Sequence, residues 1–193
     1  MEQYRNKYRN DSTRLKDRDY GPSGFYFVTI CTQNRENYFG HIEWVHNVGT
    51  QNFASQHDGH FASVDLTEIR KIAQQYWIEI PNHFPFVVLD KFIIMPNHVH
   101  GILCFNKSDY RGGSTNTFGP QSQNRASVIR GYKAATKKYA TLNTMEFAWQ
   151  KRYHERIVRM DELMATRRYI ENNPAKWIAV NYVGTQNFAS LQE

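Results

Sequence analysis

The order of apolar and polar positions along the chain predicts five strands and three helices. Runs rich in β-branched and aromatic residues are typical of strands, and apolar residues spaced three and four apart are typical of amphipathic helices. The predicted strands cover residues 25–33, 37–45, 86–95, 98–105 and 147–158. The predicted helices cover residues 66–80, 126–142 and 162–173. This order predicts an α+β fold, with a mainly antiparallel sheet and its helices on one face.

Polar stretches and prolines mark the ends of these elements. Pro81 and Pro174 follow two of the helices and are expected to end them, because the residue before proline avoids the α region. Residues 46–63 and 106–124 are predicted loops, and residues 179–193 a C-terminal tail. With 40% hydrophobic and 15% aromatic residues, the 193-residue chain can bury a core as one domain, residues 1–193.

Two strand histidines carry the clearest candidate chemistry. His98 and His100 lie one residue apart in an apolar run, and the side chains of alternate strand residues project from the same face. Paired imidazoles on a rigid strand can supply half of a metal site. The alternative is a half-buried strand whose polar face happens to carry two histidines.

A second pair of polar residues lies on the last predicted helix. Tyr169 and Asn173 are four residues apart, so they share one face of that helix. A phenol, an amide oxygen and the two histidines would meet if the helix packed over the histidine face. Taken alone, Tyr169 is one of twelve tyrosines and Asn173 is an ordinary residue before proline.

The net charge of +6 is concentrated in one part of the chain. Residues 111–145 contain six basic residues and no acid, so the remainder of the chain sums to zero. The six are Arg111, Arg125, Arg130, Lys133, Lys137 and Lys138. A concentrated basic patch in an otherwise neutral protein favours a polyanionic partner such as nucleic acid, although a solvated basic face would have the same composition.

The remaining composition indicates a cytoplasmic protein, which would be associated with the nucleoid if the basic patch binds DNA. No apolar run is long enough to span a membrane, and the N-terminus lacks the apolar core of a signal peptide. Cys31 and Cys104 each lie in an apolar run and are predicted to be reduced core residues. The sequence does not decide between a monomer and a homodimer.

Four segments resemble one family in order and spacing. They are Tyr26-Phe-Val-Thr-Ile-Cys-Thr32, Met95-Pro-Asn-His-Val-His-Gly101, Trp149-Gln-Lys-Arg-Tyr-His-Glu-Arg156 and Arg168-Tyr-Ile-Glu-Asn-Asn-Pro174. The chain resembles the REP-associated tyrosine transposases, a branch of the single-tyrosine transposases with a His-hydrophobic-His (HUH) motif. The resemblance covers roughly residues 4–178 and leaves out residues 46–63 and the tail.

The resemblance implies a ferredoxin-like HUH endonuclease fold and a role for each candidate residue. His98 and His100 would bind a divalent ion, Mg²⁺ or Mn²⁺, and Asn173 would complete the metal site; Asn172 is a weaker candidate. Tyr169 would attack single-stranded DNA and form a 5′-phosphotyrosine, which conserves the phosphodiester energy for rejoining. The partner would be hairpin DNA formed by REP-like palindromes.

Recognition of that DNA is expected to fall to the basic helix. Arg125, Arg130, Lys133, Lys137 and Lys138 would contact phosphates along a hairpin stem. Tyr132 and Tyr139, on the same helix, would either stack on unpaired bases or pack into the core.

An octapeptide occurs twice without change. Val-Gly-Thr-Gln-Asn-Phe-Ala-Ser stands at residues 48–55 and again at residues 183–190, and both copies lie outside the resemblance. Synonymous codons allow the DNA from Val48 to the first base of His57, and the DNA from Val183 to the first base of Gln192, each to be written so that it equals its own reverse complement. We hypothesise that both copies are translated palindromic elements of the kind this enzyme acts on. The alternative is a duplicated surface peptide without consequence.

The sequence is compatible with three functions. The first is a metal-dependent DNA strand transferase. The second is a domesticated hairpin-binding protein that keeps the fold without turnover. The third is a metal-dependent hydrolase that uses a bound water, which retention of a covalent tyrosine adduct would distinguish from the first.

Overall fold

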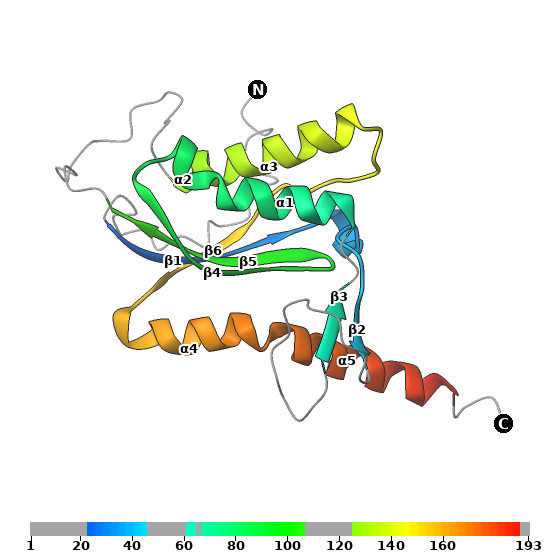
Figure 1. The fold of residues 1–193 in the computed structure, drawn as a ribbon. Coiled ribbons are helices and arrows are strands. Elements are labelled where there is room, and N and C mark those ends of the chain that lie inside the picture. Colours follow the sequence, from blue (N-terminus) through cyan, green and yellow to red (C-terminus); the bar gives the residue numbers. More distant parts are fainter. Residues whose placement is uncertain (1–22, 46–60, 65–66, 107–124, 190–193) are drawn as a thin grey trace, which may run out of the picture.

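The central element of the fold is a four-stranded antiparallel sheet (Figure 1). The computed structural model describes residues 23–45, 61–64, 67–106 and 125–189, with side chains at 23–42, 67–106 and 125–181. The sheet has the strand order β4-β5-β1-β6. Its strands are β1 (Gly24–Cys31), β4 (Val87–Met95), β5 (His98–Phe105) and β6 (His154–Val158). The predicted α+β class with an antiparallel sheet is confirmed.

A separate two-stranded ribbon lies outside the main sheet. Strand β2 (Ile42–Val45) pairs antiparallel with β3 (Phe61–Val64). The prediction of one loop over residues 46–63 is therefore wrong for 61–63, which are extended and paired. The first octapeptide copy lies outside the described residues. The short 3-10 helix η1 (Gln33–Arg35) follows β1.

Both prolines that were expected to end helices instead lie in the first turn of another. The helices are α1 (Glu68–Ile78), α2 (Ile80–His83), α3 (Arg125–Leu142), α4 (Met160–Glu171) and α5 (Asn173–Ala189). Pro81 is in the first turn of α2 and Pro174 in that of α5, where a missing N–H costs no helical hydrogen bond. The predicted tail is accordingly helical up to Ala189.

The strand predicted over residues 147–158 is shorter than expected. Only its last five residues form β6, and Trp149 makes an isolated bridge to Thr32. Lysines of α3 bind the carbonyl groups before it: Lys137 Nζ donates to Phe147 O at 2.6 Å, and Lys133 Nζ to Gln150 O at 2.6 Å. Lysine side chains thus bind two carbonyl groups of this stretch, which forms only the isolated bridge.

The helices cover both faces of the sheet, in place of the one face predicted (Figure 1). Helices α1 and α3 pack on one face over an extensive aromatic and aliphatic core, which we call the closed face. Helix α4 packs on the other, over a small cluster of Phe27, Ile102, Val158, Leu163 and Ile170. We call this the site face. Alternation along the strands explains the arrangement, since Val28 and Val99 serve the closed face and Phe27 and Ile102 the site face.

Gly101 lets α1 approach β5 closely. A Cβ at this position would come within 2.2 Å of the Trp77 ring, and Trp77 is fully buried. The glycine that follows the histidine pair therefore serves the closed face and not the site. Cys31 and Cys104 are free thiols, as expected, but only Cys31 is buried, and Cys104 is half-buried. Within the described part of the chain, no helix is long and apolar enough to cross a membrane.

Candidate active site

The two histidines lie side by side on β5 and face α4 and α5. Their ring centroids are 4.4 Å apart, and each residue is only 6% exposed. Strand β5 lies between β4 and β1 in the sheet, so its backbone is paired along both sides. The pair is therefore held on a rigid support, as the spacing predicted.

Neighbouring polar groups fix the orientation of each ring. Asn97 Oδ1 lies 2.8 Å from His98 Nδ1, and Asn97 Nδ2 donates to the Arg35 carbonyl at 3.1 Å. Thr29 Oγ1 lies 2.9 Å from His100 Nδ1. His98 Nε2 is buried and has no hydrogen-bond partner among the described residues. An imidazole held at Nδ1 with its Nε2 unpartnered is the arrangement of a metal-binding histidine.

Burial keeps both imidazoles neutral. It lowers the pKa of His98 to about 3, with smaller contributions from the charges of His100 and Arg35. Burial likewise lowers the pKa of His100 to about 4, again with a contribution from Arg35. At neutral pH the pair therefore carries lone pairs and no charge, which is the form that binds a metal ion.

Helix α4 brings Tyr169 to the same place. Its ring centroid is 5.5 Å from that of His100 and 5.9 Å from that of Phe27, which itself stacks on His100. Tyr169 is 42% exposed, unlike the histidines, so it can be reached by a large substrate. The side chain thus bridges the buried pair and the protein surface.

Asn173 reaches the site from a different element than predicted. The expected single helix breaks at Asn172, the C-cap of α4, and Asn173 is the first residue of α5. Asn173 is 8% exposed, and its side chain acts on His98, where it opposes the fall in pKa. The Asn173 side chain does not lie within hydrogen-bonding geometry of His98 Nε2. The Trp177 ring, one turn further along α5, lies 6.0 Å from His98.

The donor set fits a divalent ion bound by two imidazoles and an amide. No cluster of three or more His, Cys, Asp or Glu occurs within the described ranges, so a third ligand would be of another kind. The amide of Asn173, next to the unpartnered Nε2 of His98, can supply this third ligand. Imidazole and amide oxygen suit Mn²⁺ well, whereas Mg²⁺ prefers a larger share of oxygen ligands.

Two cations beside the site were missed from the sequence. Lys176 Nζ is 5.3 Å from the centroid of the Tyr169 ring. Lys176 lies on α5, beyond the end of the helix predicted over residues 162–173, so the predicted elements did not place it beside Tyr169. Arg35 acts electrostatically on both histidines from a turn in which Asn34 and Arg35 adopt left-handed φ values of 53° and 60°. No local pattern signals that placement.

The predicted DNA-binding residues lie on α3, which covers the closed face of the sheet (Figure 1). Arg125 differs from the expectation: it is buried, with its Nε 3.3 Å from Glu155 Oε2 and its guanidinium 4.1 Å from the Tyr26 ring centroid. A paired, buried guanidinium is not accessible to a phosphate. Arg125 is therefore not expected to contact DNA.

The other four basic residues of α3 divide into two pairs. Lys133 and Lys137 bind backbone carbonyls of the segment before β6, although Lys137 is itself exposed, and Arg130 and Lys138 are the other two exposed basic residues. Tyr132 packs edge-on against Trp77 and is 3% exposed. Of the two alternatives for this tyrosine, packing into the core is therefore the one observed.

Known proteins resemble the chain both in sequence and in fold. No model of a known protein family matches the chain. An uncharacterized protein of Haemophilus influenzae (strain Rd) is 34% identical over 177 residues, which cover 86% of this chain and 88% of that protein. The structure of a REP-associated tyrosine transposase bound to a REP hairpin superposes with a TM-score of 0.53. That match has 17% identity and covers 84% of this chain and 73% of the other, and it shows a shared fold.

Proposed function

We propose that this chain, which belongs to the same family as the uncharacterized Haemophilus influenzae protein, is a single-stranded DNA transposase. In this proposal it binds hairpin DNA of the REP type and cleaves and rejoins one strand through a 5′-phosphotyrosine. The shared fold supports the proposal, because the solved protein with that fold is a tyrosine transposase bound to a REP hairpin.

One juxtaposition supports this function above all others. A buried, neutral histidine pair lies 5.5 Å, ring to ring, from a tyrosine that is 42% exposed. A buried pair with an unpartnered Nε2 suits a metal, and an exposed phenol beside it suits attack on a macromolecule. These requirements belong to a tyrosine strand transferase and are not needed in a simple DNA-binding protein.

The proposed chemistry assigns a task to each side chain. His98, His100 and Asn173 would hold a divalent ion, which supplies charge stabilisation for the scissile phosphate. Lys176 and Arg35 would bind the phosphate oxygens beside the Tyr169 ring. Tyr169 Oη would lose its proton to solvent and form a bond to phosphorus as the bond from phosphorus to the 3′-oxygen breaks, and that oxygen would take up a proton from solvent and leave as a hydroxyl. The 3′-hydroxyl can later attack the phosphotyrosine and restore the strand.

The DNA would have to pass from α3 to the site across the β6 edge of the sheet. Strand β6 is the edge strand beside β1, and it is preceded by exposed Lys151 and Arg152. Arg156 and Arg159 continue the exposed basic strip on and after β6. We propose that phosphates of the hairpin follow this strip between Arg130 on the closed face and Tyr169 on the site face.

The test is the capture of a covalent adduct. The protein is incubated with single-stranded hairpin DNA and Mn²⁺ or Mg²⁺, denatured and analysed for DNA that stays attached to protein. Wild type is expected to form the adduct, and EDTA, His98→Ala or His100→Ala should prevent it. Tyr169→Phe should abolish it while hairpin binding persists.

The matched control is Tyr139→Phe, which removes a hydroxyl that donates to Glu68 Oε1 at 2.6 Å, away from the site. This variant should form the adduct normally. Hairpin binding without any adduct would favour the domesticated binding protein. Metal-dependent cleavage without an adduct, or with an undiminished rate in Tyr169→Phe, would favour the hydrolase and overturn the assignment of the nucleophile.

A further inference from the structure

Helix α4 presents three different sides to the rest of the molecule. Its buried stripe of Leu163, Thr166 and Ile170 faces the sheet. At about 100° per residue, Tyr169 lies to one side of this stripe, and Arg167 and Glu171 lie to the other. The catalytic candidate and these two charged residues are therefore on opposite flanks of one helix.

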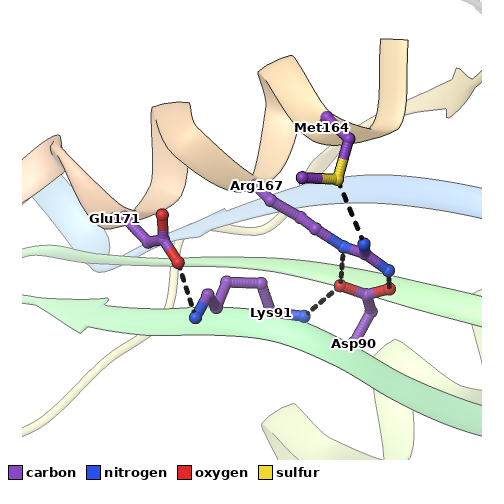
Figure 2. A network of polar contacts seen from close by, with 5 residues as sticks. All are labelled: Asp90, Lys91, Met164, Arg167 and Glu171. Atoms are coloured by element: carbon purple, nitrogen blue, oxygen red, sulfur yellow. Dashed lines mark hydrogen bonds and ion pairs between the residues drawn. The ribbon is translucent and has the colours of Figure 1, made fainter. Parts of the chain in front are cut away.

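The flank opposite Tyr169 is tied to β4 by two ion pairs (Figure 2). Arg167 makes a bidentate contact with the Asp90 carboxylate, in which Nε donates to Oδ1 at 2.9 Å and Nη2 donates to Oδ2 at 2.6 Å. This hydrogen bonding lowers the pKa of Asp90, which is also held by the Lys91 N–H at 2.6 Å. Lys91 Nζ in turn lies 2.6 Å from Glu171 Oε1. The four residues form a polar clamp between strand and helix.

A bulge in β4 makes this clamp possible. Leu89 pairs with Leu103 and Phe92 with Gly101, so Asp90 and Lys91 together oppose the single residue Ile102. Consecutive residues of a regular strand point to opposite faces, but a bulge re-aims one of them. Both Asp90 and Lys91 can consequently reach α4.

The flank that carries Tyr169 is also attached to the sheet. Arg156 of β6 donates from Nη2 to Thr166 Oγ1 at 3.0 Å and lies 3.4 Å from Glu162 Oε2 through Nη1. Its guanidinium carbon is 5.4 Å from the centroid of the Phe27 ring, against which Tyr169 also packs. Polar contacts on both flanks resist rotation of α4 about its own axis.

We propose that Asp90 and Arg167, assisted by Lys91 and Glu171, are positioning residues that set the rotation of α4 and so the place of the Tyr169 phenol beside the histidine pair. This inference rests on the proposed function, in which Tyr169 is the nucleophile. A rotation of about 20° moves a side chain about 6 Å from the helix axis by about 2 Å. A displacement of that order at a reacting atom can cost about 100-fold in rate.

The first readout is independent of activity. The protein is labelled with 3-fluorotyrosine, and the Tyr169 resonance is assigned by its loss in Tyr169→Phe. Asp90→Asn and Arg167→Gln are expected to shift or broaden that ¹⁹F resonance and to leave the resonance of Tyr132, in the closed-face core, unchanged. Arg168→Gln, the same change on the exposed neighbouring residue, is the matched control and should move neither.

The second readout is single-turnover formation of the adduct. Asp90→Asn and Arg167→Gln should lower its rate by about 100-fold at unchanged hairpin affinity, and Arg167→Lys should give an intermediate rate, since it retains the charge but loses the fork. If Asp90→Asn or Arg167→Gln fails to fold, the ¹⁹F resonance of Tyr169 and the rate of adduct formation are measured in Arg167→Lys and Lys91→Gln instead.

The two proposals fail in different ways. An unchanged Tyr169 resonance in the clamp variants would overturn the positioning role, whatever the activity. A shifted resonance in a protein that forms no adduct in its wild-type form would support the clamp and defeat the proposed function. A loss of hairpin affinity equal to the loss of rate would also overturn the positioning role, because the clamp would then act on binding.

Discussion

The two faces of the sheet are built from alternate residues of the same strands, yet they have opposite characters. The closed face is filled by large buried side chains, among them Trp77, Phe39 and Phe147, which are at most 2% exposed. The site face has a small apolar cluster, and beside it lie the buried histidines and the half-exposed Tyr169. On β5, Val99 serves one face and His100 the other.

This division allows polar groups to be buried at low cost to the fold. Apolar burial on the closed face supplies stability, and tight packing there holds β5 in place. The histidines on the other face are then positioned without having to contribute to the core. Helix α4 is attached both by the burial of Leu163 and Ile170 and by the ion pairs of Asp90 and Arg156. Directed polar contacts thus supplement a smaller apolar core on the site face.

The largest expected effect is on the closed face. Trp77→Ala should lower the free energy of unfolding by about 3–5 kcal/mol, because it removes a fully buried ring that stacks on Phe92 and meets Tyr132 edge-on. Urea unfolding measures the change. Val88→Ala, at a position that is 55% exposed, is the control and should change little.

A substitution at Gly101 tests the close contact between β5 and Trp77. Gly101→Ala alone should destabilise by about 1–3 kcal/mol, since the new methyl would collide with Trp77. In the Trp77→Ala background the methyl has room, so the cost of the second change should fall. Additive costs would contradict the close approach of α1 to β5.

The next effect tests whether the closed face also serves DNA. Arg130→Gln with Lys138→Gln should weaken hairpin binding about 10-fold and lower the dependence of log affinity on log salt by about 2, if each residue contacts one phosphate. Binding is measured across a salt series.

Lys133→Gln with Lys137→Gln is the matched comparison on the same helix. These lysines bind the Phe147 and Gln150 carbonyls, so their loss should reduce the free energy of unfolding. The salt dependence of hairpin binding should change less than in the Arg130/Lys138 variant. Equal salt slopes for wild type and the Arg130/Lys138 variant would place the DNA elsewhere.

A smaller effect of acid should be found on the site face. The folded-state pKa of Asp90 lies below its unfolded value near 3.8, chiefly because Arg167 binds the carboxylate. The pair therefore stabilises the fold above that value, and the contribution is lost as the pH falls through the folded-state pKa. Its size should be about 1 kcal/mol, as the pair is partly exposed.

Urea unfolding between pH 7 and pH 3 checks this prediction. Asp90→Asn should be less stable than wild type at pH 7, and the difference should shrink toward pH 3. A constant difference over that range would mean that the Asp90 carboxylate is not stabilised by Arg167.

The smallest effect concerns the repeated octapeptide, which we expect to matter as DNA and not as protein. The second copy overlaps α5 up to Ala189, and among the α5 residues whose side chains are described, which end at 181, the last buried one is Ile178. Removal of residues 183–193 should leave urea stability and adduct formation nearly unchanged. The hypothesis fails if the gene's codons break the palindrome, or if the truncated protein unfolds.

The sequence by itself determined the elements that follow from local periodicity. The strand predicted over 98–105 has those bounds in the structure, and the helix predicted over 126–142 begins one residue earlier. The spacing of His98 and His100 placed both on one face, since alternation on a strand is a property of the backbone. The approach of Tyr169 and Asn173 was proposed from a shared face of one helix, whereas in the structure Tyr169 lies on α4 and Asn173 begins α5.

Only the tertiary structure decided what covers each face and which charges remain available. Periodicity gives a helix its apolar stripe but not the sheet face on which it packs, so α4 was not expected opposite α3. Arg125 and Arg130 are alike in sequence, but only Arg125 meets a buried carboxylate. The bulge that aims both Asp90 and Lys91 at α4, and the left-handed turn that carries Arg35, depend on partners distant in the chain. Such contacts leave no local pattern from which they could be predicted.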